Sequence, residues 1–173
     1  RAIALNPNNA AAHDLLGCVL DELGRFEEGW KEFEIAQQLD PNRDHLADPL
    51  YNRGQFDRAI EIRQRIALRD PGDGYNHYAL AMNYAQKRKF REFTDEMGQA
   101  GQLYGMPEMP GRLRYAYDHS GGGGALREFA RELEHFAANG QLYLPGNLAE
   151  LYAYLGDKDR ALHWLEDYRL HHD

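Results

Sequence analysis

Three similar stretches of sequence decide the fold: AIALNPNN at residues 2–9, AQQLDPNR at residues 36–43 and IALRDPGD at residues 66–73. In each, an apolar segment typical of the last turns of a helix precedes one proline and then small polar residues. Proline ends a helix because its ring removes a backbone N–H and clashes with the preceding turn. Pro41 follows Pro7 by 34 residues, and Pro71 follows Pro41 by 30. This spacing predicts a repeat in which each unit is a pair of helices.

A second pattern recurs within these units, namely one small residue between large apolar ones. It reads Leu16-Gly17-x2-Leu20 early in the chain, Leu80-Ala81-x2-Tyr84 in the middle and Leu148-Ala149-x2-Tyr152 near the end. The small residue lets two helices approach closely, and the large ones fill the space between neighbouring pairs. One such pair cannot bury its apolar face alone, so the pairs are expected to stack. The turns inside the pairs are expected at Gly24, Gly54 and Gly156.

The period and the order of these residues resemble the tetratricopeptide repeat (TPR) family, whose pattern is W-x2-L-G-x2-Y, then A-x3-F, then P. The resemblance covers essentially the whole chain, with His13 and His77 where the family usually carries Trp. It implies an all-α fold, a right-handed TPR-type α-α superhelix or solenoid of about five helix pairs. The expected organisation is a single array over residues 1–173, with 1–7 as the end of a preceding repeat and repeats at 8–41, 42–71, 72–105, 106–141 and 142–173.

The same patterns predict the helices and three departures from the regular repeat, one of which is a long connection at Gly140–Pro145. We expect helices at 10–23, 26–39, 44–52, 56–69, 73–87, 89–103, 109–119, 125–138, 146–155 and 158–170. The second repeat is four residues short, and its first helix contains Pro49. The run Gly121–Gly124 is expected to form a mobile loop after a helix that ends near Ser120, because consecutive glycines carry a high backbone entropy cost in a helix.

Composition disfavours several classes of partner. The chain has 20 basic and 28 acidic side chains and a net charge of −8, whereas nucleic acids and anionic membranes select concentrated Lys and Arg. No apolar run reaches the roughly 20 residues of a membrane-spanning helix. Cys18 is the only cysteine, which fits a reducing compartment. We therefore expect a cytoplasmic protein without nucleic-acid or membrane partners.

Motifs for catalysis or metal binding are missing from the sequence. There is no HExxH and no pair of histidines four residues apart, and no GK[ST] follows the glycine run. Ser120 is the only serine, and Cys18 has no base placed beside it, because His13 lies about 140° away around the helix. We expect no enzyme activity, no cofactor and no metal site, and we expect His13 and His77 to pack rather than to ligate.

The resemblance implies that the first helix of each pair lines a concave groove that binds a peptide. The positions that carry over to this sequence are Asp14, Cys18, Asp21, Tyr75, Tyr78, Met82, Tyr115, Asp118, Tyr143, Asn147, Glu150 and Tyr154. Tyrosine suits an interface because a rigid ring buries apolar area and keeps a polar tip. The sequence leaves open whether these tyrosines bind a partner or only pack between repeats.

The chemistry of this groove favours a neutral or basic segment with apolar anchors. Some TPR proteins bind acidic C-terminal tails through a clamp of Lys, Arg and Asn. The matching positions here hold Asp14, Cys18, Tyr75 and Ala79, so that clamp is absent. The leading hypothesis is a scaffold that binds another protein or peptide.

The end of the chain raises an alternative. LAELYAYLGDKDRALHWLE, at residues 148–166, looks like the last repeats of TPR regions in large bacterial signalling proteins. The chain begins at Arg1 without Met, and we expect it to be a fragment of such a protein. The array closes on the apolar residues Ala161, Leu162, Trp164, Leu165, Tyr168 and Leu170 with no clearly polar capping helix after them, which would favour a homodimer through uncapped ends. The alternative is therefore a self-association or sensing module of a bacterial transcription regulator or kinase.

Overall fold

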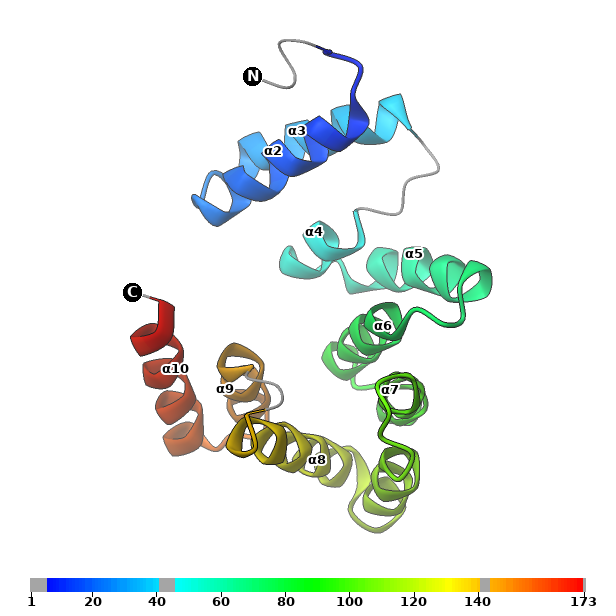
Figure 1. Ribbon diagram of the computed structural model, residues 1–173, viewed down its shortest axis with the longest axis vertical. Coiled ribbons are helices and arrows are strands. Elements are labelled where there is room, and N and C mark those ends of the chain that lie inside the picture. The colour runs from blue at the N-terminus through cyan, green and yellow to red at the C-terminus, as the bar shows by residue number, and fades with distance from the viewer. Residues whose placement is uncertain (1–5, 41–45, 141–143, 173) are drawn as a thin grey trace. The chain divides into compact units, whose positions relative to one another are not determined.

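The computed structural model describes residues 6–40, 46–140 and 144–172, and it confirms an all-α fold in these ranges, where no strand occurs. Where the connections are described, short turns join successive helices, as between α2 and α3 (Figure 1). In chain order the helices are α2 (Ala10–Glu22), α3 (Phe26–Leu39), α4 (Ala47–Asn52), α5 (Phe56–Arg69), α6 (Gly74–Gln86), α7 (Phe90–Leu103), α8 (Met109–Ala138), α9 (Pro145–Tyr154) and α10 (Lys158–His172).

The chain divides into two compact units. The N-terminal unit, Arg1–Lys87, holds α2 to α6, and the C-terminal unit, Arg88–Asp173, holds α7 to α10. The boundary falls between α6 and α7, inside the stretch 72–105 that the sequence predicts as the third repeat. Within each unit, helices that are neighbours in the chain pack on one another, for example α2 on α3 and α9 on α10.

The predicted glycine turns are confirmed, and they share one hydrogen-bond pattern. Gly24, Gly54 and Gly156 have φ values of 73°, 70° and 78°, the left-handed conformation that glycine adopts without a steric cost. The residue after each glycine donates its N–H to the carbonyl five residues earlier, at 2.8, 2.8 and 2.9 Å respectively. This is the Schellman ending of a helix, and its recurrence shows that the turns repeat in structure as well as in sequence.

The two histidines of the repeat pattern also have equivalent contacts. His13 Nε2 lies 3.0 Å from the carbonyl oxygen of Pro7, and His77 Nε2 lies 3.2 Å from that of Pro71. Both side chains are buried. His13 Nδ1 also lies 2.6 Å from Glu32 Oε2 on α3. The histidines therefore anchor the proline turn that precedes the first helix of a pair.

Close helix contact in the N-terminal unit depends on Gly17. A Cβ at this position would lie 2.6 Å from the Phe33 ring, so only glycine allows α2 and α3 to pack this closely. Phe33 is fully buried and packs with Leu50 and Ala59 of the α4–α5 hairpin. Burial of such apolar side chains is the main force that holds successive hairpins together.

The prediction of a mobile loop at Gly121–Gly124 is wrong. Helix α8 continues through this run, and only Gly121 has a non-helical backbone, with φ 60° and ψ −160°. Packing explains the difference, because a Cβ on Gly122 would overlap the ring of Phe90, and one on Gly124 would lie 2.6 Å from Ser120 Cβ. The glycines thus allow a one-residue kink and a close approach of α7 to α8. We call residues 109–120 the first limb of α8 and residues 122–138 its second limb.

The remaining helix predictions agree with the structure to within a few residues. The first helix of the second repeat is short as expected, since α4 has six residues with Pro49 in its first turn. Residues 44 and 45 of the predicted 44–52 helix lie outside the described ranges. In the described part of the chain, no helix combines the length and the apolar character that crossing a membrane requires.

Candidate functional site

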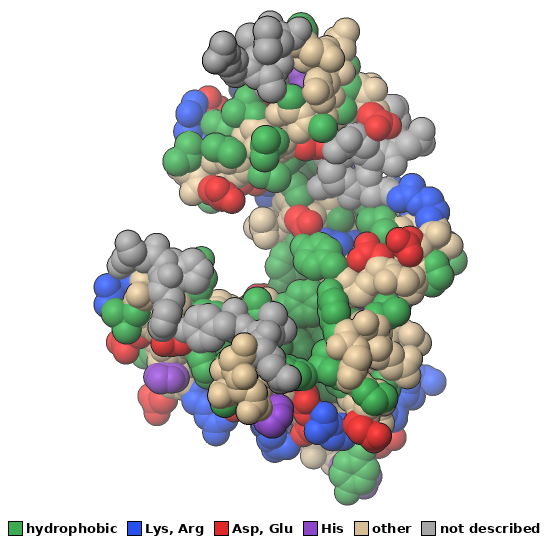
Figure 2. Space-filling model, viewed as in Figure 1, with side chains coloured by type: hydrophobic (Ala, Val, Ile, Leu, Met, Phe, Trp, Pro, Cys, Tyr) green, Lys and Arg blue, Asp and Glu red, His purple; other side chains and the backbone are tan. Residues whose placement is uncertain are grey.

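Helix α6 carries two neighbouring tyrosines on one face. The rings of Tyr75 and Tyr78 have centroids 6.5 Å apart and are tilted by 33°. Tyr75 is 53% exposed, and Tyr78 is half-buried. Figure 2 shows hydrophobic side chains gathered over the part of the molecule where Figure 1 places α6. This is the most aromatic surface among the predicted binding positions of the N-terminal unit.

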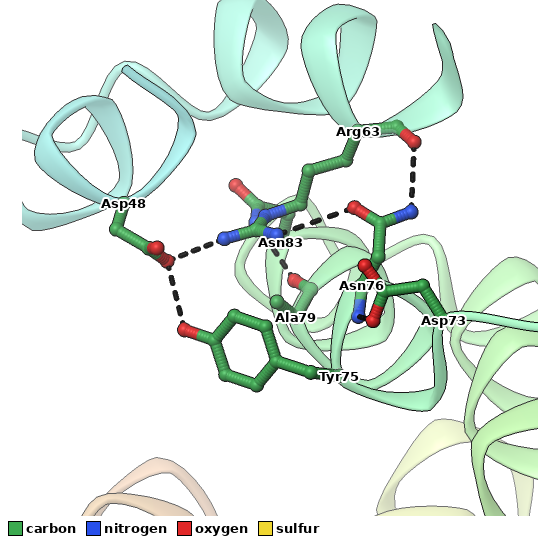
Figure 3. Close-up of polar contacts among 7 residues, drawn as sticks. All are labelled: Asp48, Arg63, Asp73, Tyr75, Asn76, Ala79 and Asn83. Carbon is green, nitrogen blue, oxygen red and sulfur yellow. Dashed lines mark hydrogen bonds and ion pairs between the residues drawn. The ribbon is translucent and has the colours of Figure 1, made fainter. Parts of the chain in front are cut away.

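A buried arginine lies behind the tyrosines. Arg63 comes from α5, where it follows the buried Ala59 and Ile60 at helical spacing, and it is only 3% exposed. Its Nη2 donates to the Asp48 carboxylate of α4, and its Nη1 lies 3.3 Å from Asn76 Oδ1 of α6 (Figure 3). A buried charge must be paired and hydrogen-bonded, and here the partners come from two neighbouring helices. Arg63 therefore joins α4, α5 and α6.

This arginine and its carboxylate hold the Tyr75 ring in place. The Tyr75 hydroxyl donates to Asp48 Oδ1 at 3.1 Å, and the Arg63 guanidinium carbon lies 5.6 Å from the ring centroid. Burial, followed by the negative charge of Asp48, raises the pKa of the Tyr75 hydroxyl. The hydroxyl thus remains a donor at neutral pH, and the ring is held while half of its surface stays exposed.

The base of the site is also polar. Asn76 Nδ2 donates to the carbonyl of Arg63 at 2.9 Å, and Asp73 Oδ1 caps α6 by accepting the Asn76 N–H at 3.0 Å. Asn83 Nδ2 donates to the carbonyl of Ala79 at 2.8 Å (Figure 3). Two buried atoms, Arg63 Nε and Asn83 Oδ1, have no hydrogen-bond partner in the described structure. We call Asp48, Arg63, Tyr75, Asn76 and Tyr78 the α6 site.

Asp48 is the exposed negative charge of the α6 site. Its side chain is 55% exposed, although Oδ1 accepts from both Arg63 and Tyr75. No hydrogen bond to Oδ2 occurs among the described residues. A cationic or N–H group of a ligand could therefore bind at Oδ2, beside an exposed aromatic ring.

The predicted positions on α2 differ from one another in the structure. Asp21 forms a two-pronged ion pair with Arg53, with N–O distances of 2.9 and 3.0 Å, so its carboxylate joins α2 to the end of α4. Asp14 is buried, whereas Cys18 is exposed. Partial desolvation, and then the charges of Asp14 and Asp21, raise the pKa of the Cys18 thiol, which keeps it protonated and unreactive at neutral pH.

The third predicted position on α6, Met82, is buried, unlike Tyr75.

Five predicted positions lie on described parts of the C-terminal unit, and the first four are on α8 and α9. Tyr115 is 66% exposed and stacks on His119 at 3.9 Å between centroids, and Asp118 beside it is also exposed. Asn147 and Glu150 on α9 are half-buried. A sixth position, Tyr143, lies outside the described residues.

The last predicted position, Tyr154, is half-buried at the end of α9. Its ring packs edge-on against Phe90 of α7, with centroids 6.3 Å apart. Its hydroxyl is buried and has no hydrogen-bond partner in the described structure. Tyr154 therefore packs within the C-terminal unit, which is one of the two roles that the sequence left open for the tyrosines.

The sequence reasoning missed Asp48, Arg63 and Asn76, which build the α6 site. One signal for Arg63 was available, because its spacing from Ala59 and Ile60 places it on the apolar face of α5. An arginine on such a face requires a partner, yet nothing local indicates that Asp48, 15 residues away, supplies it. Within the described ranges, no three His, Cys, Asp or Glu side chains are placed to bind a metal ion.

Taken together, fold and site define an all-α protein of successive helical hairpins with an aromatic and polar surface on α6. No model of a known protein family matches the chain.

Proposed function

We propose that this chain is a TPR-type scaffold that binds a segment of another protein at the α6 site. The repeated Schellman turns and the repeated contacts of His13 and His77 with a proline carbonyl support a repeat of the TPR kind. The observation that carries the binding role is the Tyr75 ring, which is half exposed although two groups hold it in place. A ring fixed before binding loses little conformational entropy when a partner covers it.

The charge of the site indicates which segment it would bind. Asp48 is the exposed charge beside the ring, Arg63 is buried, and the whole chain carries a net charge of −8. An acidic segment would be repelled, whereas a Lys, an Arg or a backbone N–H could donate to Asp48. The proposed ligand is a neutral or basic segment with an aromatic or aliphatic anchor over Tyr75 and Tyr78.

Peptide selection tests this proposal. Random peptides displayed on phage would be selected on the intact chain, and the affinity of a selected synthetic peptide would be measured by fluorescence anisotropy. Tyr75→Ala with Tyr78→Ala should weaken binding at least about tenfold, since both anchoring rings are lost. Tyr75→Phe should weaken it less, because the ring remains but its bond to Asp48 is removed.

Tyr104→Ala is the matched control, because Tyr104 is similarly exposed (57%), follows α7 in the other unit and is not one of the predicted binding positions. Asp48→Asn should weaken basic peptides more than neutral ones. If the double substitution and Tyr104→Ala have the same effect, the α6 site is not where the peptide binds.

Self-association is a second candidate, favoured by the surface of α10. Leu162, Leu165 and Leu170 are 59%, 52% and 67% exposed, which is unusual for three leucines of one helix. A second copy of the chain could cover them. Light scattering over a range of protein concentrations should then show a dimer that Leu162→Lys with Leu165→Lys abolishes, whereas Leu68→Lys, at an exposed position of α5, has no effect.

A further inference from the structure

A small cleft in the C-terminal unit is lined by three arginines. It lies between the second limb of α8 and the turn from α9 to α10, and it has a volume of about 270 Å³. Its lining residues are Arg127, Arg131, Tyr152, Leu155, Asp157 and Arg160. Figure 2 shows Lys and Arg side chains gathered along the lower edge of the view, where Figure 1 places α8, with acidic side chains among them. Three guanidinium groups around one cleft are unexpected on a chain with a net charge of −8.

Two of these arginines stand four residues apart on one face of α8. Arg131 Nη1 pairs with Glu128 Oε2 at 2.7 Å. Arg127, by contrast, makes no hydrogen bond or ion pair with any described residue, and its guanidinium lies over Gly123 at the start of the second limb. Like charges at this spacing slightly destabilise a helix, so an anion bound between the two arginines would stabilise this placement.

The third arginine comes from the first turn of α10. Arg160 Nε pairs with Asp157 Oδ2 at 3.2 Å, and its Nη1 donates to the Tyr152 hydroxyl at 3.0 Å. That hydroxyl donates in turn to Glu134 at 2.7 Å, which fixes the position of Arg160. The positive end of the α10 helix dipole lies at the same place, because Asp157 and Arg160 both line the cleft.

We propose that this cleft binds a phosphate group. Arginine binds phosphate through paired N–H donors, and a guanidinium carries five of them, of which the neighbouring side chains use few here. Phosphate has three acceptor oxygens and nearly two negative charges, which matches a cleft lined by three arginines better than a carboxylate does. The volume is below the range of about 300–1,000 Å³ typical of sites for drug-sized ligands, so it suits one anionic group.

Among the described residues, the carboxylates near the cleft leave one of its three arginines without an acidic partner. Glu128, Asp157 and Glu134 are the acidic groups in contact with its lining. Glu128 and Asp157 already accept from arginines, and Glu134 accepts from the Tyr152 hydroxyl. Arg127 has no such partner and would bind the anion directly. The cleft involves none of the twelve positions that the TPR resemblance assigns to the groove, so it would be a second site with the opposite charge preference.

The two possible sources of phosphate are the inorganic ion and a phosphorylated side chain of a partner, and both are used as probes. Sodium phosphate, and separately a short phosphoserine peptide with neutral flanking residues, would be titrated into the ¹⁵N-labelled intact chain at constant ionic strength. Saturable shifts are expected at the amides of residues 123–131 and 157–160. Saturable shifts elsewhere, or no saturation with either probe, would overturn the proposal.

Variants then test the arginines. Arg127→Gln with Arg131→Gln should weaken phosphate binding at least about tenfold, and Arg127→Gln alone should weaken it by several-fold. Arg25→Gln is the matched control, because Arg25 is an exposed arginine with a glutamate three residues away, as Arg131 is, and it lies on the N-terminal unit. Arg25→Gln removes one positive charge, as Arg127→Gln alone does, and it should change the affinity for phosphate less than about twofold.

An equal loss of affinity in the Arg25→Gln variant would show that binding follows net charge alone, which contradicts a defined site. Much tighter binding of the phosphoserine peptide than of inorganic phosphate would identify a phosphorylated partner as the source. Equal affinities would identify the free ion. Circular dichroism of each variant shows whether it is folded, and the shifts of the unmodified chain test the site without any substitution.

Discussion

Two sets of arginines, one set in each unit, are placed in opposite ways. In the N-terminal unit, Arg53 and Arg63 lie between helices, and each pairs with an aspartate of another helix. In the C-terminal unit, Arg127, Arg131 and Arg160 face an open cleft, and their acidic partners lie within three residues of them or are absent. The first arrangement joins hairpins, whereas the second leaves positive charge available at the surface.

This difference teaches how the same residue type can stabilise a fold or create a site. A guanidinium between helices pairs with groups on several elements. Its partner carboxylate can still be exposed on one side, as Asp48 is. A guanidinium at a cleft still has N–H donors that no neighbouring side chain uses, and these can bind a ligand. The N-terminal unit therefore presents an aromatic and acidic surface at α6, and the C-terminal unit presents a basic cleft at α8.

Replacing the buried arginine should have the largest effect. Arg63→Ala removes bonds to Asp48 and Asn76 and leaves a cavity, so it should lower the free energy of unfolding by about 2–3 kcal/mol. Arg131→Ala removes only an exposed pair within one helix and should change this free energy by less than about 0.5 kcal/mol. Urea denaturation of both variants measures the contrast. Equal losses would contradict the distinction between the buried and the cleft arginines.

The kink of α8 offers a comparison within one unit. Gly122→Ala places a Cβ against the Phe90 ring and should destabilise the C-terminal unit by about 1–3 kcal/mol. Gly123→Ala meets only the guanidinium of Arg127 at ordinary contact distance, and it should stabilise α8 by about 0.5–1 kcal/mol through helix propensity. Thermal unfolding would measure the two shifts. If both substitutions changed the unfolding temperature in the same direction, the Phe90 ring would not be the reason for a glycine at position 122.

The junction of the two units contains the one non-glycine residue with positive φ in the described ranges. Arg88 has φ 57° at the position after α6 where other helices end in glycine. A side chain costs about 1 kcal/mol or more in this conformation, so Arg88→Gly should raise the free energy of unfolding by about 0.5–1 kcal/mol. Gly156→Ala, in the equivalent turn after α9, should lower it. Urea denaturation that shows no gain for Arg88→Gly would mean that the turn is not strained.

The smallest effect concerns pH in the N-terminal unit. The hydrogen bond from His13 to Glu32 is the largest contribution that raises the pKa of His13, against the effect of burial, which lowers it. Protonated His13 is therefore stabilised by folding. This contribution is complete below the pKa of the unfolded state, about 6.5, and is lost as the pH rises through the higher pKa of the folded state.

Unfolding free energies measured between about pH 5 and 8 test this expectation. Stability should fall with rising pH in this range, and Glu32→Gln should reduce the slope because it removes the partner that raises the pKa. An unchanged slope in Glu32→Gln would exclude His13 as its source.

The helices and their turns could be predicted because their signals are local. Pro7 and Pro71 begin a turn, Gly24 and Gly54 end a helix, and each acts through its own backbone. The prediction of a loop at Gly121–Gly124 is wrong because helix propensity alone favours a loop there, whereas packing of the glycines against Phe90 favours the helix. The α6 site was half predicted, since Tyr75 and Tyr78 came from the repeat pattern and their polar support did not.

The sequence by itself determined an all-α chain, the approximate bounds of its helices and the glycine turns between them, because these depend on residues within a few positions of one another. Only the tertiary structure decided that Asp48 and Asn76 pair with Arg63, that Asp21 pairs with Arg53 and that Arg160 meets Arg127 at one cleft. Those partners are 13 to 33 residues apart in the chain. Their meeting depends on how the hairpins pack, since no local preference of the backbone selects one distant partner over another.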